Sequence, residues 1–142
     1  MSKRKFYFFI FFFVFFTGSN GITKDNYFDE GKKLFDEKKF SESKFKFQQD
    51  IVFHPKSEQS YLYLAKIFKE EEEDDLEEQN LNTVILLNPQ NEEALYLLTL
   101  LKIKKSDYDE SEKLIKKFKK ICKTICGKEA ELKKKFQRLE TR

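Results

Sequence analysis

The segments Pro55-Lys56-Ser57-Glu58 and Pro89-Gln90-Asn91-Glu92 decide the fold, because they repeat one pattern 34 residues apart. Proline ends the preceding helix, the small polar residue two positions later can cap the free amides of the next helix, and the glutamate complements its dipole. Each segment therefore predicts a boundary between two helices. A period of about 34 residues is that of a helix-turn-helix repeat, so the spacing predicts stacked helical hairpins.

The apolar residues follow the same period when the chain is divided into frames 24–57, 58–91 and 92–125. We call equivalent positions of the three frames a column. Five columns carry apolar or small side chains in most frames: the fourth (Tyr27, Tyr61, Leu95), the eighth (Gly31, Ala65, Thr99), the eleventh (Leu34, Phe68, Lys102), the twenty-fourth (Phe47, Leu81, Ile115) and the thirtieth (Phe53, Leu87, Ile121). Small side chains in the eighth column let two helices approach closely, and the bulky ones fill the space around them.

Over about residues 24–125 this pattern resembles the tetratricopeptide repeat (TPR), most clearly in the first two frames. The resemblance implies an all-α fold, a right-handed solenoid of about three 34-residue TPR-like helical hairpins in one domain, residues 22–142. The chain departs from the family pattern at several positions, which are Glu30, Ser43, Glu77, Lys102, Ser111 and Lys123. Because Lys123 stands where proline would end the third repeat, we expect the last helix of that repeat to continue to Gly127.

The last segment, residues 128–142, places Leu132, Phe136 and Leu139 at helical spacing with lysines between them. A solenoid needs a terminal helix whose inner face covers the last repeat and whose outer face meets water. The segment therefore predicts a C-terminal capping helix.

Residues 1–21 have the pattern of a secretory signal: a basic start at Lys3 to Lys5, an apolar run from Phe6 to Phe16, and small residues after it. The run has 11 residues, fewer than the roughly 20 that span a bilayer as a helix. We expect a cleaved signal peptide, with an uncleaved N-terminal anchor as the alternative. Either way the remainder is expected to be exported, to the periplasm or the cell envelope.

The charges are unevenly distributed. Three of the 28 basic residues and none of the 25 acidic ones precede residue 22, so the remainder is formally neutral and gives no reason to expect nucleic acid binding. Residues 22–101 carry 10 basic and 18 acidic residues, and residues 102–142 carry 15 basic and 7 acidic ones. The acidic residues concentrate between Glu70 and Glu78. That run lacks the Asp-x-Asp-x-Gly turn of a calcium loop, so we expect a solvated, partly frayed helix junction.

No arrangement of residues predicts catalysis. His54 is the only histidine, and its place at a helix end just before Pro55 is a sufficient structural explanation. The four glycines do not cluster into a phosphate-binding loop. We therefore expect no enzymatic activity, no metal and no cofactor.

Cys122 and Cys126 are the only cysteines. An even pair in an exported protein suggests a disulfide. Residues four apart on a regular helix, however, have Cβ atoms about 6 Å apart, farther than the roughly 3.8 Å of a disulfide. We expect two free thiols facing the core, with the disulfide as the alternative.

The resemblance also implies a binding surface, because in this family the first helix of each repeat lines a concave groove. The residues that it assigns to partner binding are Phe28, Lys32, Phe35, Leu62, Tyr63, Lys66, Tyr96, Leu97 and Leu100. The family's grip on a terminal carboxylate is not supported, since aromatic and aliphatic residues stand at several of the positions it needs. An apolar groove with lysine along one side suits an extended or helical segment that carries aromatic anchors and some acids.

The sequence thus predicts a non-enzymatic protein–protein interaction adaptor, or scaffold, of the cell envelope or periplasm. Two alternatives stay open. The C-terminal helix or another copy of the chain could fill the groove, which would make a homo-oligomer. The protein could instead act at a membrane surface or in envelope assembly through its basic C-terminal half, where the lysines of Lys113 to Lys123 alternate with apolar residues as in an amphipathic helix.

Overall fold

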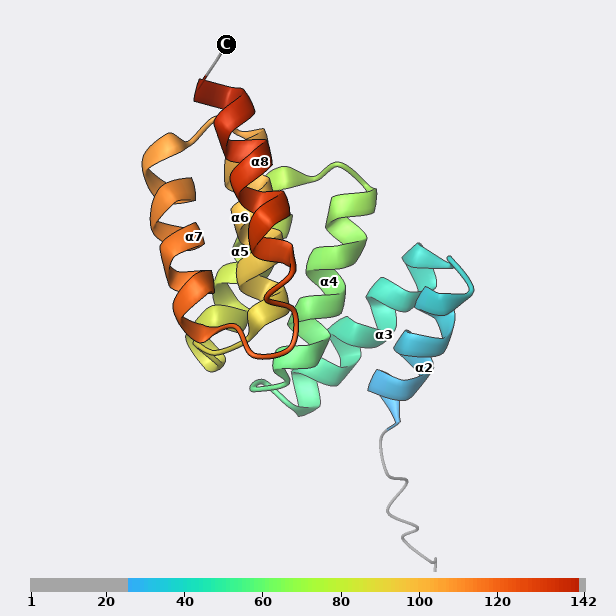
Figure 1. The fold of residues 1–142 in the computed structure, drawn as a ribbon. Helices are drawn as coiled ribbons and strands as arrows, with labels where there is room; N and C mark the ends of the chain where they lie inside the picture. Colours follow the sequence, from blue (N-terminus) through green and yellow to red (C-terminus); the bar gives the residue numbers. More distant parts are fainter. Residues whose placement is uncertain (1–25, 141–142) are drawn as a thin grey trace, which may run out of the picture.

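The computed structural model describes residues 26–140, and within that range the chain forms seven helices and no strand (Figure 1). The helices are α2 (Tyr27–Asp36), α3 (Phe40–Phe53), α4 (Glu58–Glu70), α5 (Asp74–Leu87), α6 (Glu92–Lys104), α7 (Tyr108–Ile121) and α8 (Lys128–Glu140). Residues 1–21, for which a signal peptide or anchor is predicted, lie outside the described range. None of these seven helices is both long and apolar enough to cross a membrane.

The helices pair into three hairpins that stack side by side. α2 contacts α3, α4 contacts α5 and α6 contacts α7, while α3 contacts α4 and α5 contacts α6. In Figure 1 the hairpins follow one another from the lower right to the upper left, and α8 lies over the last of them. This arrangement confirms the all-α solenoid predicted from the repeat period, with two helices in each frame and α8 as the terminal helix.

The small residues of the eighth column lie where the two helices of each hairpin meet. Gly31, Ala65 and Thr99 are all buried. The space beside Gly31 is especially tight, because a Cβ atom there would lie 2.8 Å from Cε1 of Phe47. Small side chains therefore set the distance between the helices, as the repeat pattern predicts.

The two helix starts that follow the prolines are capped differently. The side chain of Asn91 accepts a hydrogen bond from the amide of Ala94 at 2.9 Å, which is the predicted cap of α6. Ser57 precedes α4 but its side chain makes no such bond, so the cap predicted there is wrong. The Ser57 hydroxyl instead lies 3.0 Å from that of Ser60, which donates a hydrogen bond to the buried Asp50. The hydroxyl groups at this junction thus serve the Asp50 carboxylate and do not cap the start of α4.

The turn inside each hairpin holds a non-glycine residue in the left-handed backbone region. The φ angles are 59° at Lys38, 59° at Glu72 and 57° at Ser106. The three residues occupy one column, since they stand 34 residues apart. The repeat is therefore also present in the backbone, at a column whose side chains differ completely.

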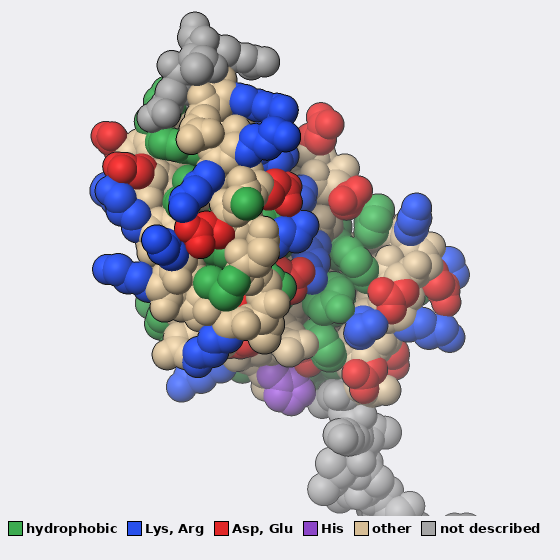
Figure 2. Space-filling view, in the orientation of Figure 1, with side chains coloured by type: hydrophobic (Ala, Val, Ile, Leu, Met, Phe, Trp, Pro, Cys, Tyr) green, Lys and Arg blue, Asp and Glu red, His purple; other side chains and the backbone are tan. Residues whose placement is uncertain are grey.

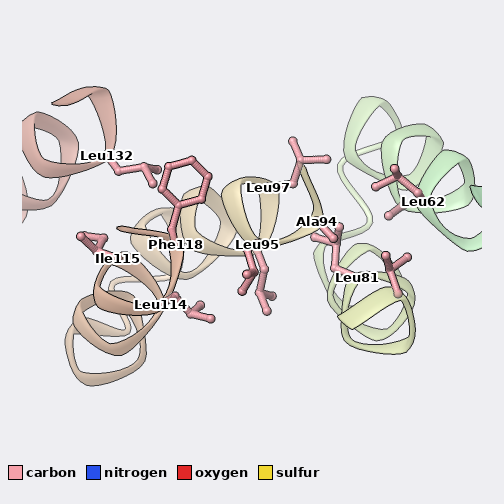
Figure 3. Close-up of a cluster of buried hydrophobic side chains, with 12 residues drawn as sticks. Leu62, Leu81, Ala94, Leu95, Leu97, Leu114, Ile115, Phe118 and Leu132 are labelled. Atoms are coloured by element: carbon pink, nitrogen blue, oxygen red, sulfur yellow. The ribbon is translucent and has the colours of Figure 1, made fainter. Parts of the chain in front are cut away.

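Two clusters of buried side chains form the core. The larger one joins α4 to α8, and Figure 3 labels nine of its members: Leu62, Leu81, Ala94, Leu95, Leu97, Leu114, Ile115, Phe118 and Leu132. Leu132 of α8 is fully buried and lies beside Phe118, so α8 covers the last hairpin as predicted. The smaller cluster lies between the first two hairpins and contains Phe47, Leu64, Ile67 and Phe68.

α7 ends at Ile121, so the predicted continuation of this helix to Gly127 is wrong. Cys122 leaves the helical conformation, with ψ at 137°. Its Cα atom lies 5.2 Å from that of Cys126, and the two residues form a disulfide bond. The expected free thiols are therefore wrong as well. The geometric objection to a disulfide applied to a regular helix, and the chain between α7 and α8 is not one.

A glutamate from the neighbouring helix fixes this connection. The carboxylate of Glu92, at the start of α6, accepts hydrogen bonds from the amides of Thr124 and Ile125, both at 3.0 Å. These bonds lower the pKa of Glu92, the bond from Ile125 most of all. The carboxylate satisfies amides that a continued α7 would have bonded internally, which explains why the helix can end early.

The acidic side chains at the start of α5 form ion pairs with the lysines at the end of α6. The ion pairs are Asp74–Lys104 at 2.6 Å, Asp75–Lys105 at 3.1 Å, Glu78–Lys102 at 2.7 Å and Glu78–Lys105 at 3.0 Å. The junction itself, Glu71 to Glu73, is an exposed turn, which agrees with the expected solvation of this segment. The acidic and basic halves of the chain meet at the boundary between the second and third hairpins.

Candidate functional site

The predicted groove residues all lie on the first helices of the hairpins. Phe28, Lys32 and Phe35 are on α2, Leu62, Tyr63 and Lys66 are on α4, and Tyr96, Leu97 and Leu100 are on α6. The structure divides them into an open aromatic part, a buried part and a part next to α8.

The open part is a cluster of rings between the first two hairpins. The ring of Tyr63 lies 5.8 Å from that of Phe28, 5.1 Å from that of Phe35 and 5.0 Å from that of Phe47, measured between centroids. Phe47 is fully buried, whereas the other three rings are partly exposed. Figure 2 shows apolar side chains gathered over α4, on the side that faces α2 and α3. We call Phe28, Phe35 and Tyr63 the aromatic cluster.

Two of the predicted lysines stand beside the aromatic cluster. The ammonium of Lys66 lies 4.7 Å from the centre of the Tyr63 ring and 2.8 Å from the carboxylate of Glu93. Lys32 is exposed and pairs with Asp36 at 2.8 Å, and this hydrogen bond raises the pKa of Lys32. A lysine over an aromatic face is held by the electrons of the ring, so Lys66 presents its charge at the edge of the cluster. The structure thus brings together the apolar and basic features that were predicted for the groove.

Leu62 and Leu97 do not lie on the groove surface. Both are buried in the larger core cluster, where they pack between α4 and α6. Their columns point toward the groove, but neighbouring hairpins lie close enough to cover these two side chains. They support the groove from below and are not available to a ligand.

Tyr96 lies next to the C-terminal helix. The ammonium of Lys128 is 5.3 Å from the centre of the Tyr96 ring, and the ring of Phe118 is 6.4 Å away. Burial raises the pKa of Tyr96, and a hydrogen bond from its hydroxyl to Glu131 raises it further. Because α8 contacts both α6 and α7 and lies in front of α6 in Figure 1, the third hairpin offers much less of its groove than the first two.

A cavity of about 560 Å³ lies where α4 and α6 end beside α8. Its walls are formed by Lys69, Glu72, Glu77, Leu100, Leu101, Ile103, Lys104, Ser106, Lys135 and Arg138. Of the predicted groove residues, only Leu100 is among them. The cavity combines apolar walls with four basic side chains. Lys69 and Ile103 occupy one column of the first helices, so the sequence could have added them to the predicted groove residues. The sequence does not show that α8 lies beside them.

The buried carboxyl group of this cavity belongs to Glu77. Burial raises the pKa of Glu77 to about 7, and the carboxylate of Asp74 adds to the rise. The ammonium groups of Lys69 and Lys104 act in the opposite direction. Glu77 occupies the column in which the other two frames have Ser43 and Ser111, so only the second hairpin carries a titrating group there.

Other candidates for chemistry have structural roles. His54 ends α3, and its Nδ1 lies 2.9 Å from a carboxylate oxygen of Asp50. Burial by itself would raise the pKa of Asp50, but hydrogen bonds from Ser60, Ser57 and His54 lower it overall. Within residues 26–140, no group of histidine, cysteine and acidic side chains is placed to hold a metal ion.

The amphipathic face of α7 is used inside the fold. Its apolar residues Leu114, Ile115 and Phe118 are buried against α6 and α8, and the lysines of the helix remain outside. The apolar face is therefore not available to insert into a membrane.

Comparisons with known proteins agree with this geometry. No family model matches the sequence, and no match was found among curated protein sequences. Among solved structures, the first TPR domain of Spaghetti (RPAP3) bound to the HSP90 peptide SRMEEVD is similar, with a TM-score of 0.72 and 17% identity, over 80% of this chain and 90% of that one. The Sgt2 TPR domain from Aspergillus fumigatus has a TM-score of 0.69 and 15% identity, over 83% and 82% of the two chains.

The TPR2B domain of yeast Sti1, solved in complex with pHsp70, is also similar, with a TM-score of 0.68 and 13% identity over 79% of this chain and 91% of that one. At such identities the likeness shows the fold alone. The protein is therefore an all-helical solenoid of the tetratricopeptide-repeat type, as the proline spacing and the eighth column predict.

Proposed function

We propose that this protein is a non-enzymatic adaptor of the cell envelope or periplasm that binds a segment of another protein through its aromatic cluster. The observation that carries the proposal is the convergence of Phe28, Phe35 and Tyr63, all partly exposed, with Lys32 and Lys66 beside them. Partly exposed aromatic rings over a packed base are the usual anchors of protein interfaces. The lysines favour a partner that has an acidic residue near its apolar anchor.

Similar structures support binding of this kind. Spaghetti and Sti1 are both seen in complexes with partners from heat-shock proteins, so the fold is one that accommodates peptide segments. The binding region in this chain is different in extent, because α8 occupies much of the third hairpin. The partner segment is accordingly expected to contact the first two hairpins.

The proposed location rests on two features. The pattern of residues 1–21 is that of an export signal. The disulfide between Cys122 and Cys126 is of a kind that persists in oxidising compartments outside the cytosol. Mass spectrometry of the native protein tests the export step, since a cleaved signal would leave an N-terminus between about Ser19 and Ile22. Retention of Met1 or Ser2 would support the anchored alternative.

Peptide selection tests the binding function. A displayed peptide library is selected against the full chain, and recovered sequences are expected to pair an aromatic or aliphatic residue with a neighbouring acid. Tyr63→Ser should then weaken binding of a recovered peptide by about 30-fold, the equivalent of about 2 kcal/mol for an anchor residue. Lys66→Glu should weaken it less, and most strongly at low salt.

The matched control is Phe45→Ser, because Phe45 is an exposed aromatic residue on α3 outside the aromatic cluster. Its loss should leave peptide binding unchanged. Thermal melts of both serine variants separate loss of binding from loss of fold. Equal losses for the two folded variants, or loss only when Lys113, Lys116 and Lys120 are reversed to glutamate, would contradict binding at the aromatic cluster.

A further inference from the structure

One end of the solenoid carries exposed apolar side chains that the fold does not use. α2 begins at this end, and the connections that follow α3, α5 and α7 all lie there, at the bottom of Figure 1. We call residues 27, 52–56, 86–90 and 119–126 the proximal end. The aromatic cluster lies along the sides of α2 and α4 and reaches the proximal end at Phe28, in the first turn of α2.

Two aliphatic residues project from equivalent places at the proximal end. Val52 and Leu86 are 34 residues apart, in the last turns of α3 and α5, and they are 74% and 82% exposed. Phe53 is 55% exposed, and its ring stacks on that of Tyr27, with the ring centroids 5.4 Å apart. Exposed apolar side chains that gather in one place on a folded domain indicate a contact surface.

In the third hairpin, the proximal end carries lysines in place of apolar side chains. Lys120 occupies the column of Val52 and Leu86, so the row changes from apolar to basic along the stack. The proximal end also carries three further exposed lysines, and none of the four forms an ion pair with a described residue: Lys56, Lys119, Lys120 and Lys123.

Acidic side chains also lie near the proximal end, each with partners of its own. Glu92 is bound by the amides of the α7–α8 connection, and Glu93 is paired with Lys66. Glu58 accepts hydrogen bonds from the side chains of Asn88 and Asn91. Glu92 and Glu58 are bound by neutral groups and so keep their negative charge, and Glu129 interacts with Lys119. The four lysines still outnumber the carboxylates here that no lysine pairs, so the proximal end is positive on balance.

We propose that the proximal end docks on the surface of a bilayer that contains anionic lipids. Val52, Phe53 and Leu86 enter the interfacial region, and the lysines meet the headgroups. Apolar side chains that project among lysines are the two components of interfacial membrane binding, which adds apolar burial to attraction for anionic lipid. Val52 and Leu86 are 74% and 82% exposed, so they project outward, as apolar side chains that enter a membrane interface must.

The place where the chain joins the fold agrees with this orientation. The described residues begin at Asn26, beside Tyr27 at the proximal end, and nine residues separate it from the apolar run that ends at Phe16. Nine extended residues reach at most about 30 Å. An apolar N-terminal segment held in a bilayer would therefore keep the proximal end near the same membrane. The proposal itself rests on the described side chains and does not depend on the function of the aromatic cluster.

Tryptophan placement tests the orientation, because the chain contains no tryptophan. Leu86→Trp puts a single fluorophore at the proximal end of α5. Leu76→Trp puts one at an exposed site ten residues earlier on the same helix, about 15 Å away along its axis. The full chain carrying either change is mixed with vesicles of phosphatidylcholine, with and without phosphatidylglycerol.

The expected result is a shift to shorter emission wavelength, and quenching by brominated lipid, for the Leu86→Trp variant with the anionic vesicles. The Leu76→Trp variant should show neither. Lys56→Gln and Lys120→Gln should each weaken vesicle binding by about fivefold. Lys113→Gln, on the earlier part of α7, should weaken it less.

Three results would overturn the proposal. One is the absence of a shift at position 86 with anionic vesicles, and another is an equal shift at positions 76 and 86. The third is a shift at position 86 that grows with protein concentration without vesicles, which would assign the proximal end to a second copy of the chain.

Discussion

Gly31 lies directly against the ring of Phe47, so close that an added Cβ atom would be 2.8 Å from Cε1 of the ring. Gly31→Ala should therefore force α2 and α3 apart and lower the free energy of unfolding by about 1 to 3 kcal/mol. Ala65→Leu, in the same column of the second hairpin, should act in the same way. Gly127→Ala is the control, because nothing lies within 4 Å of a Cβ atom there. Unchanged melting of the Gly31→Ala variant would contradict the close approach.

The left-handed turns offer stabilising substitutions. Lys38, Glu72 and Ser106 each adopt a φ near 58° that costs a residue with a side chain about 1 kcal/mol, whereas glycine adopts it freely. Replacing each by glycine should raise the free energy of unfolding by about that amount, and the three gains should add because the turns lie apart. Chemical denaturation measures the change. Lys33→Gly, inside α2, should instead destabilise by about 1 kcal/mol.

Glu77 should make stability depend on pH in the direction opposite to most carboxylates. Its pKa is raised from 4.5 to about 7 in the folded state. The folded protein therefore binds the proton at Glu77 more tightly than the unfolded chain does. Protonated Glu77 adds to the free energy of unfolding, and this contribution is fully present below pH 4.5 and is lost as the pH rises through about 7.

Glu77→Gln should remove that loss. As the pH rises from 4.5 to 8, the free energy of unfolding of the variant should increase by up to about 3 kcal/mol relative to that of the natural protein. Melting temperatures across this range measure the difference. Glu78→Gln serves as the comparison, because hydrogen bonding to Lys102 lowers the pKa of Glu78. Its effect should have the opposite sign, and two variants with parallel pH profiles would contradict the environment described for Glu77.

The disulfide should hold α8 in place. Cys126→Ser should lower the free energy of unfolding by about 2 kcal/mol, the chain-entropy value for so short a ring. It should also speed hydrogen exchange in α8 more than in α2 and α3, since Cys122 and Cys126 lie at the α7–α8 connection. A reducing agent should affect the natural protein in the same way and leave the Cys126→Ser variant unchanged. Equal acceleration in α2 and α8 would show that the bond acts on the whole solenoid.

Local rules account for the parts of the fold that the sequence predicted. Proline cannot continue a helix, and only small residues fit where Gly31 and Ala65 lie, so both leave a regular mark in the sequence. The early end of α7 has no such signal in the sequence. It depends on Glu92, more than thirty residues earlier, which binds the amides of the α7–α8 connection. The disulfide lies in that same connection.

The predicted groove was described less completely by the sequence. The structure places Tyr63 beside Phe28 and Phe35 of α2, and Lys66 over the Tyr63 ring. Column positions show which side of α4 and α6 a residue occupies. They do not show how closely the hairpins pack, which decides that Leu62 and Leu97 are buried. The position of α8 over Tyr96 depends on the connection before it, so it could not be read from the repeat.

The ion pairs between α5 and α6 restrict how the array can grow. Asp74 of the second hairpin meets Lys104 of the third, whereas the second hairpin itself has Glu70 in the place of that lysine. If the second hairpin were duplicated in tandem, carboxylate would face carboxylate at the new junction. The three modules share a backbone, but their charges make them unequal partners at this junction. A tandem copy of the second hairpin would need a basic residue in place of Glu70 to restore the ion pair with Asp74.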